Sequence, residues 1–169
     1  MDSHEHVLFR EEQKFNQLWL WVLVLVPVSI AWYAAIEQLV FGSPFGGNPA
    51  SDSSTFLSLV LFGILLPLFM SSLRLVTEVR GDGLYIRFRP FHGSYRKFPF
   101  DSILSCKVQT YRPVRDYGGW GIRYGIRGKA YNVSGSKGLM LEFVNGKKLL
   151  IGSQQAEEFA AAMPCSSEA

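Results

Sequence analysis

Two long stretches without a formal charge constrain this chain more than any other feature. The first runs from Leu18 through Ile36, and the second runs from Ser53 to Leu73. About 20 apolar residues in a helix, at about 1.5 Å each, cross the roughly 30 Å hydrocarbon core of a bilayer. The pattern predicts transmembrane helices over residues 18–41 and 55–75, joined by a short outer loop of residues 42–54 that is rich in turn-forming residues.

Both predicted helices contain a proline. Pro27 lies in the first and Pro67 in the second. Within a bilayer, neighbouring helices and hydroxyl groups can satisfy the backbone groups that a proline frees. We therefore expect a kink at each proline and not the end of a helix.

The distribution of Lys and Arg predicts an orientation. Arg10 and Lys14 precede the first stretch, the loop has neither residue type, and the other fifteen follow Leu73. The positive-inside rule then places both termini in the cytoplasm and the hairpin in the inner membrane. A cleaved signal peptide fits the first stretch less well, because the segment before it is acidic overall and the apolar run is longer than the usual h-region.

The first seventeen residues predict a short helix at the membrane interface. Leu8, Phe15, Leu18 and Trp19 fall near one helical face, and charged or amide side chains cover the rest. We interpret residues 1–17 as a cytoplasmic interfacial segment.

After Leu73 the pattern alternates and turn signals recur, as in short antiparallel strands. Asn145-Gly146 marks a two-residue hairpin, and Ser153 is expected to cap a final helix that ends near Met163. The predicted strands cover residues 73–80, 84–89, 95–98, 103–111, 120–124, 130–133, 139–144 and 147–152.

These elements predict an α+β membrane protein with a cytoplasmic domain over residues 76–164 and a tail over residues 165–169. A small sheet must curl or pair to bury its apolar face, and a helix can close an open corner. The order of strands followed by one helix resembles a pleckstrin-homology-like (PH-like) antiparallel β-barrel or sandwich with a C-terminal helix.

Four motifs carry a family resemblance. They are Phe9-Arg10-Glu11-Glu12-Gln13, Tyr111-Arg112-Pro113 with Gly118-Gly119-Trp120-Gly121-Ile122-Arg123, Ala130-Tyr131-Asn132-Val133-Ser134-Gly135, and Leu150-Ile151-Gly152-Ser153-Gln154. With these motifs, most of the chain resembles an uncharacterised bacterial family with two N-terminal transmembrane helices and a C-terminal PH-like domain. The resemblance implies topology and fold and transfers no activity.

The sequence offers little for catalysis, cofactors or metals. His4 and His6 lack further ligands at metal-site spacing, so we interpret them and His92 as surface histidines. Cys106 and Cys165 are interpreted as separate thiols in a reducing compartment. The glycines between Tyr117 and Tyr131 match no phosphate-binding fingerprint and indicate a loop or a bulged strand pair. We expect no enzyme, no cofactor and no metal site.

A basic and aromatic segment remains as the candidate surface. From Arg74 onward there are fifteen Lys and Arg against eight Asp and Glu. Near a membrane such charge favours anionic lipid headgroups, although the positive-inside rule alone also explains it; nucleic acid is not expected. The residues of the candidate surface are Arg112, Arg115, Trp120, Arg123, Tyr124, Arg127 and Lys129.

Two functions remain open. The first is a non-enzymatic membrane-anchored module that scaffolds a protein partner or contacts the anionic inner-membrane surface. The alternative is an accessory subunit of a larger membrane complex, in which the transmembrane helices make the main contacts. The small residues Ser29, Ala31, Ala34 and Ala35 would allow another helix to approach closely.

Overall fold

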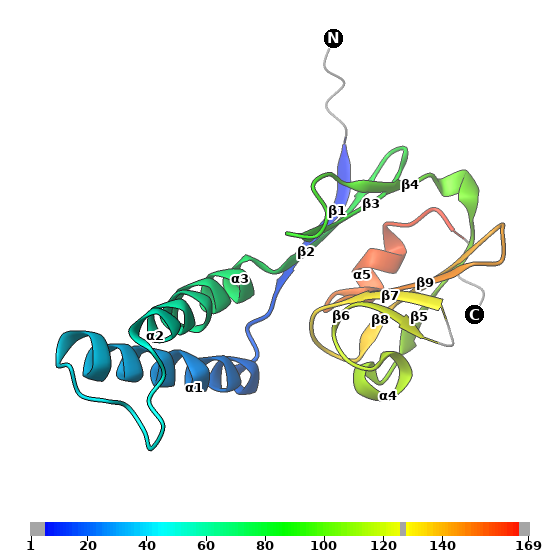
Figure 1. The fold of residues 1–169 in the computed structure, drawn as a ribbon. Helices are drawn as coiled ribbons and strands as arrows, with labels where there is room; N and C mark the ends of the chain where they lie inside the picture. The colour runs from blue at the N-terminus through cyan, green and yellow to red at the C-terminus, as the bar shows by residue number, and fades with distance from the viewer. Residues whose placement is uncertain (1–5, 126–127, 166–169) are drawn as a thin grey trace, which may run out of the picture. The chain divides into compact units, whose positions relative to one another are not determined.

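The computed structural model describes residues 6–125 and 128–165. The chain forms two compact units (Figure 1). One unit is the helical segment Phe15–Leu73, and the other combines the residues before Phe15 with the residues after Leu73. The helical segment is therefore an insertion into a domain whose two parts lie on either side of it in the sequence.

The helical unit is the predicted hairpin. Its helices run without a break over Leu18–Val40 and Asp52–Ser72, and both are long and apolar enough to cross a membrane. Each contains π-helical turns, so the elements are α1 (Leu18–Ala35), η1 (Ile36–Val40), α2 (Asp52–Ser58), η2 (Leu59–Leu65) and α3 (Leu66–Ser72). Neither Pro27 nor Pro67 ends its helix, as predicted.

Polar contacts hold the two helices together. The Trp32 indole donates to the Gly63 carbonyl at 3.2 Å, and a Cβ atom at Gly63 would lie 2.9 Å from the Leu59 side chain and 3.2 Å from the indole nitrogen. Near the turn, the Gln38 amide donates to the Ala50 carbonyl and accepts from the Thr55 hydroxyl. The helices thus contact each other at mid-length and at the turn.

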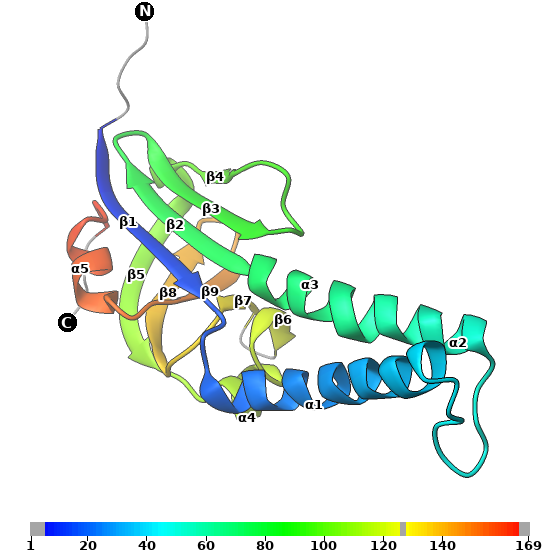
Figure 2. The ribbon, with the colours of Figure 1, turned by 90° about the vertical axis from the view of Figure 1, so that its left-hand side faces the viewer.

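Sheet A contains four antiparallel strands in the order β1-β2-β3-β4 (Figure 2). The strands are β1 (Val7–Lys14), β2 (Arg74–Arg80), β3 (Gly83–Arg89) and β4 (Arg96–Phe98). Lys14 and Arg74, the residues that flank the helical hairpin, are direct register partners. The hairpin therefore occupies the position of the turn between two paired strands.

The prediction of an interfacial helix within residues 1–17 is wrong, because Val7–Lys14 is a strand. Phe9, Glu11 and Gln13 are buried, whereas Arg10 and Glu12 are exposed, which is the period of two that a strand requires. The charge and amide on the buried side hid this alternation. The domain consequently includes residues that the predicted range 76–164 leaves out.

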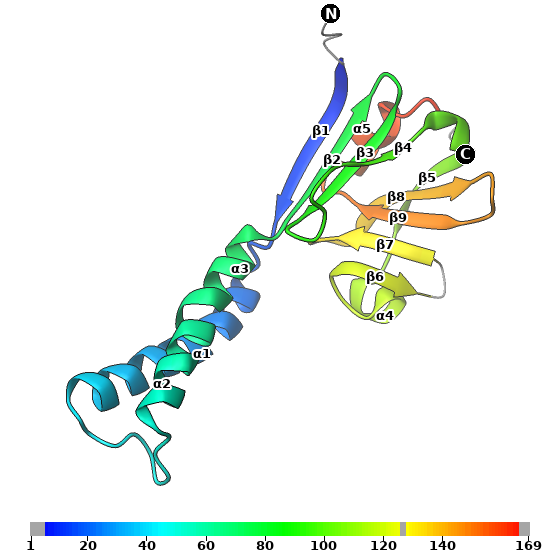
Figure 3. The same ribbon diagram turned by 45° about the horizontal axis from the view of Figure 1, so that its top comes forward.

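Sheet B contains five strands in the order β5-β8-β9-β7-β6 (Figure 3). They are β5 (Ile103–Thr110), β6 (Gly121–Gly125), β7 (Gly128–Asn132), β8 (Lys137–Phe143) and β9 (Lys148–Gly152). The prediction of purely antiparallel pairing is wrong at one place, because β7 and β9 are parallel. Among the described residues the two sheets are separate and form no closed barrel.

Strands β2–β9 match the predicted positions, with ends that differ by up to two residues. Two short helices were not predicted: η3 (Phe100–Ser102), which connects the sheets, and α4 (Pro113–Tyr117). The glycine-rich segment forms the strand pair β6–β7, apart from residues 126–127, which lie outside the described residues.

The apolar faces of the two sheets meet in one core. Phe98 of sheet A packs against Phe143 of sheet B, with ring centroids 5.5 Å apart. The final helix α5 (Ala156–Ala161) adds Phe159, whose ring stacks on Phe9 of β1 at 5.1 Å. The fully buried side chains of the core include Leu75, Val79, Leu84, Ile86, Phe88, Leu139, Leu141, Ile151 and Phe159.

Two polar side chains of β1 fix this strand to the C-terminal part of the domain. Glu11 accepts hydrogen bonds from the Ser153 hydroxyl at 2.6 Å and from the Gln154 amide at 2.8 Å. The Gln13 amide donates to the Gly152 carbonyl at 2.7 Å. The prediction that Ser153 caps the last helix is therefore wrong. Gln155 occupies the N-cap position, and α5 begins at Ala156.

The interpretation of the two cysteines as separate thiols is wrong. Cys106 of β5 and Cys165 form a disulfide, with their Cα atoms 5.9 Å apart. The bond attaches the segment after α5 to sheet B across a sequence separation of 59 residues. Sequence alone could not show this proximity, because it arises from the return of the chain after α5.

The position of Glu11 predicts a difference between two adjacent glutamates. Glu11→Ala removes the acceptor of the buried Ser153 hydroxyl and of the partly buried Gln154 amide, and should lower the free energy of unfolding by about 2–3 kcal/mol. Glu12→Ala is the matched control, because Glu12 makes only exposed ion pairs worth about 0–1 kcal/mol. Urea unfolding followed by the β-sheet signal in circular dichroism would measure both. Equal losses would contradict this role of Glu11.

Candidate functional site

The predicted basic and aromatic surface is divided between two faces of sheet B. Arg112 and Arg115 are exposed at α4, which packs through Tyr117 against Ala130 of β7. Arg123 is the register partner of Ala130, so it lies on the same face as α4. Its guanidinium donates to the Trp120 carbonyl at 2.9 Å.

Tyr124 and Lys129 lie on the opposite face of the same strand pair. They are direct register partners, and the Lys129 ammonium lies 5.2 Å from the Tyr124 ring centroid and 4.7 Å from that of Tyr131. Burial alone would lower the pKa of Lys129, but the two tyrosines stabilise its charge and raise the pKa overall. Arg127, also predicted, lies outside the described residues.

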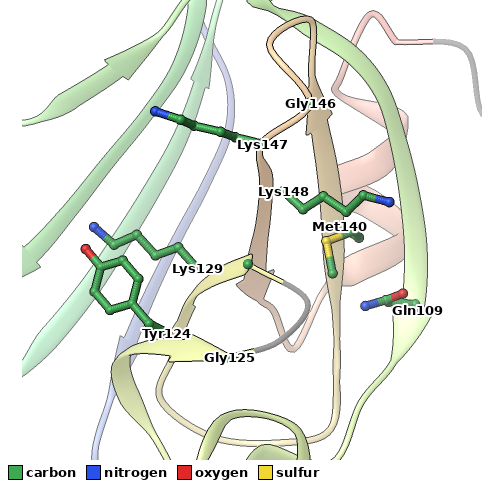
Figure 4. Close-up of a pocket in the computed structure, with 9 residues that line it drawn as sticks. Gln109, Tyr124, Gly125, Lys129, Met140, Gly146, Lys147 and Lys148 are labelled. Atoms are coloured by element: carbon green, nitrogen blue, oxygen red, sulfur yellow. The ribbon is translucent and has the colours of Figure 1, made fainter.

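An open hollow of about 980 Å³ lies where β6 ends and β7 and β9 begin (Figure 4). Lys129 and Lys147 extend to the side of Tyr124, whereas Lys148 extends to the side of Met140 and Gln109. The lining residues are Gln109, Tyr124, Gly125, Gly128, Lys129, Met140, Gly146, Lys147 and Lys148. None of these nine residues carries a carboxylate.

Two of the glycines that line this hollow lie against neighbouring backbone. A Cβ atom at Gly128 would lie 2.3 Å from the Lys148 carbonyl oxygen, and one at Gly125 would lie 2.5 Å from the Asp116 carbonyl oxygen. Both positions therefore require glycine for the close approach of two backbones. Lys147 and Lys148 were missed as site residues because they belong to a hairpin that is distant in sequence from the predicted segment.

The outer face of sheet A carries a second and larger set of cations. They are Arg10 and Lys14 of β1, Arg74 and Arg80 of β2, Arg87 and Arg89 of β3, and Lys97 of β4. Sequence reasoning noted the alternation after Leu73 but not that four strands contribute to one basic face. Only the register between strands shows it.

Part of this face is neutralised around Glu78, whose side chain is 4% exposed. Arg80 donates to its carboxylate at 2.7 Å, the Tyr95 hydroxyl donates at 2.9 Å, and Arg10 lies at 3.5 Å. Burial alone would raise the pKa of Glu78, but the hydrogen bonds from Arg80 and Tyr95 and the nearby charges lower it overall. Glu78 is therefore ionised at neutral pH.

His92 is not the surface histidine that the sequence predicted. It is 8% exposed, its Nδ1 accepts a hydrogen bond from the Phe88 amide, and its ring contacts Tyr131. Burial lowers its pKa, and the charges of Arg96 and Lys129 lower it further. A neutral imidazole thus holds the turn after β3.

The described residues contain no group of three or more His, Cys, Asp or Glu side chains placed to hold a metal ion. The chemistry that the two basic surfaces offer is the binding of anions through ammonium and guanidinium groups. The predicted residues that the structure describes therefore lie on two faces of sheet B and not on one.

Comparison with known proteins gives one match. Residues 1–168 match a family of unknown function, DUF6141. The chain belongs to the DUF6141 family. No curated protein matches it, and no solved structure does.

The four motifs of the resemblance meet inside this DUF6141 chain. Residues 9–13 contact residues 152–154 through the bonds of Glu11 and Gln13. The Asn132 amide donates to the Gly119 carbonyl at 3.3 Å, and a Cβ atom at Gly152 would lie 2.6 Å from the Tyr111 hydroxyl oxygen. Burial raises the pKa of Tyr111 to about 12. Contacts between the motifs therefore lie at the centre of the domain, whereas Arg10, Arg112 and Arg123 within the motifs are exposed on its charged surfaces.

The burial of His92 predicts how stability depends on pH. Its folded pKa lies below its ordinary value of 6.5, so the unfolded chain binds the proton first. The contribution of His92 to the free energy of unfolding is therefore fully present above pH 6.5, and it is lost as the pH falls toward the folded pKa. His92→Asn keeps a hydrogen-bond acceptor without a titrating group.

Thermal unfolding of both proteins from pH 6.5 down to about pH 5, above the range of ordinary carboxylates, would measure this effect. The wild-type midpoint should fall across this interval, whereas the midpoint of the variant should start lower and stay level. Parallel curves would show that another group is responsible.

Proposed function

We propose that this protein is a non-enzymatic module anchored in the inner membrane by its helical hairpin, whose β domain contacts the anionic lipid surface beside it. The observation that carries the proposal is the basic outer face of sheet A, two of whose strands continue directly into the apolar helices. In the second version of this proposal, the same surface binds a protein partner instead of lipid.

The exposure of the helices supports membrane insertion. Within the most apolar window of each helix, only 17% and 11% of the residues are buried inside the protein. Leu18, for example, is 80% exposed and Val40 is 72% exposed. Apolar surface of this extent requires an apolar environment, and a bilayer supplies it.

The pairing of β1 with β2 supports two crossings. Lys14 and Arg74 are register partners, so the chain must leave and re-enter the sheet at the same end. Each of the two helices between them is long enough to span a bilayer. Two crossings return the chain to the side of the membrane from which it started, as the pairing of β1 with β2 requires. This holds for either orientation of the protein.

For the orientation we propose cytoplasmic termini, supported by the absence of Lys and Arg between Glu37 and Leu73. The disulfide between Cys106 and Cys165 argues for the opposite side, because such bonds are rare in reducing compartments. The two features make opposite predictions, so a labelling experiment can decide between them. The PH-like nature of the domain is likewise a proposal, supported by two facing sheets and a C-terminal helix.

The alternative, an accessory subunit of a membrane complex, has less support than the sequence indicated. Ala31 and Ala35 are buried within the hairpin itself, so they are not available for close contact with another helix. Ser29 is exposed and Ala34 is half-buried, and these two residues five positions apart do not form a small-xxx-small packing motif.

A soluble form of the domain would test the lipid contact. Because Lys14 and Arg74 face each other, an Asn-Gly turn can replace residues 15–73 and join β1 to β2 directly. This protein should fold with a β-sheet circular dichroism spectrum and float with vesicles of phosphatidylglycerol but not of phosphatidylcholine. Added salt should weaken the binding. Flotation that ignores the lipid charge would exclude the lipid form of the function.

Labelling of the outer loop would test the orientation. Gly46→Cys, introduced together with Cys106→Ser and Cys165→Ser, gives one thiol in the loop between the helices. A membrane-impermeant maleimide should label it in intact cells without permeabilisation. Labelling only after permeabilisation would place the β domain and its disulfide outside the cytoplasm.

A further inference from the structure

The basic face of sheet A is unevenly neutralised along its strands. At the end remote from the helices, Arg80 and Arg10 surround Glu78, and Lys97 pairs with Asp82. Arg87 donates to the carbonyls of His92 and Gly93. The cations in this part of the sheet therefore have partners within the protein.

At the end of the sheet to which the helical hairpin is attached, the cations are neighbours of one another. Lys14, Arg74 and Arg89 are register partners across β1, β2 and β3, so their side chains form one row on one face. Paired residues on neighbouring strands lie about 4.5–5.5 Å apart between Cα atoms. Like charges directly opposite each other destabilise a sheet unless an anion compensates them.

Among residues 6–125 and 128–165, one carboxylate forms ion pairs with this row. Glu12 lies 3.3 Å from Arg74 and 3.8 Å from Lys14. Arg89 is exposed, and among the described residues it has no ion-pair partner. The row therefore carries two positive charges more than the protein neutralises.

The chain itself fixes the distance of this row from the apolar helices. The second helix ends at Ser72 and Arg74 follows two residues later, so Arg74 lies within about 7 Å of the helix end even in a fully extended chain. The headgroup layer on each side of a bilayer is about 5–8 Å thick. With the hairpin inserted, Arg74 lies at the level of the lipid phosphates, and its register partners Lys14 and Arg89 are its direct neighbours in the sheet.

We infer that Lys14, Arg74 and Arg89 form a binding site for the phosphate of an anionic glycerophospholipid headgroup. The inference rests on the proposed function and gives it a location that differs from the sequence-predicted surface on sheet B. Arginine pairs with phosphate through two parallel hydrogen bonds, and the lysine adds a point charge. The trimethylammonium group of a choline headgroup would be repelled by the same row.

Native mass spectrometry of the full-length protein in detergent, titrated with phosphatidylglycerol or phosphatidylcholine, tests the site. The wild type should bind phosphatidylglycerol at least about tenfold more tightly, since each surface-near cation changes the dissociation constant about fivefold. The variant K14Q/R74Q/R89Q should lose this preference. Inorganic phosphate in excess should not displace the lipid, because the acyl chains contribute to binding.

Two comparisons make the result specific. The variant R112Q/R115Q/R123Q removes the same charge from the competing surface at α4 and should keep the preference. The single variant R89Q removes a residue without an internal partner, so the fold should survive, and binding should weaken about fivefold. Lys107→Gln, on an exposed position of β5, is its matched control and should bind as the wild type does.

Each outcome has a separate meaning. A wild type without preference for phosphatidylglycerol would refute the lipid form of the proposed function, and this inference with it. A preference that persists in K14Q/R74Q/R89Q and R89Q would refute the inference alone. Equal losses in the two triple variants would assign the preference to overall charge and refute the site. Displacement by inorganic phosphate would show a phosphate site without a lipid requirement.

Discussion

The pairing of β1 with β2 is the constraint on which the rest of the structure depends. It makes the helical hairpin an insertion within a sheet, because Lys14 and Arg74 are opposite each other. It brings Glu11 and Gln13 to the junction of β9 and α5, where they bind Ser153, Gln154 and Gly152. It also completes the basic face of sheet A. One strand of eight residues thus connects the helical hairpin, the core and the charged surface.

The sequence predicted the parts of this fold that have a simple period. The two apolar helices and the positions of β2–β9 follow from long uncharged runs and from alternation between turns. Strand β1 was mistaken for a helix because its buried side carries Glu11 and Gln13, which a hydrophobicity pattern scores as exposed. The parallel pair β7–β9, the burial of His92 and the Cys106–Cys165 bond depend on tertiary contacts. No local pattern contains that information.

For the candidate surfaces too, local sequence patterns predicted less than the tertiary contacts determine. The predicted block from Arg112 to Lys129 is dense in the sequence, but strand alternation sends Arg123 and Tyr124 to opposite faces. Conversely, Lys14, Arg74 and Arg89 are far apart in the sequence and become one row only through the register of three strands. A count of charges along the chain therefore found that the domain is basic but could not find where the charges meet.

The insertion of the hairpin between two paired strands also sets an order for biogenesis. During synthesis, β1 leaves the ribosome before either helix, and its partner β2 follows only after both helices have been made. Glu11 and Gln13 must wait longer still, because their partners Gly152, Ser153 and Gln154 are near the end of the chain. Until β2 has been made, both edges of β1 are unpaired, which is the kind of segment that aggregates or recruits chaperones. Completion of the domain therefore follows the synthesis of both helices.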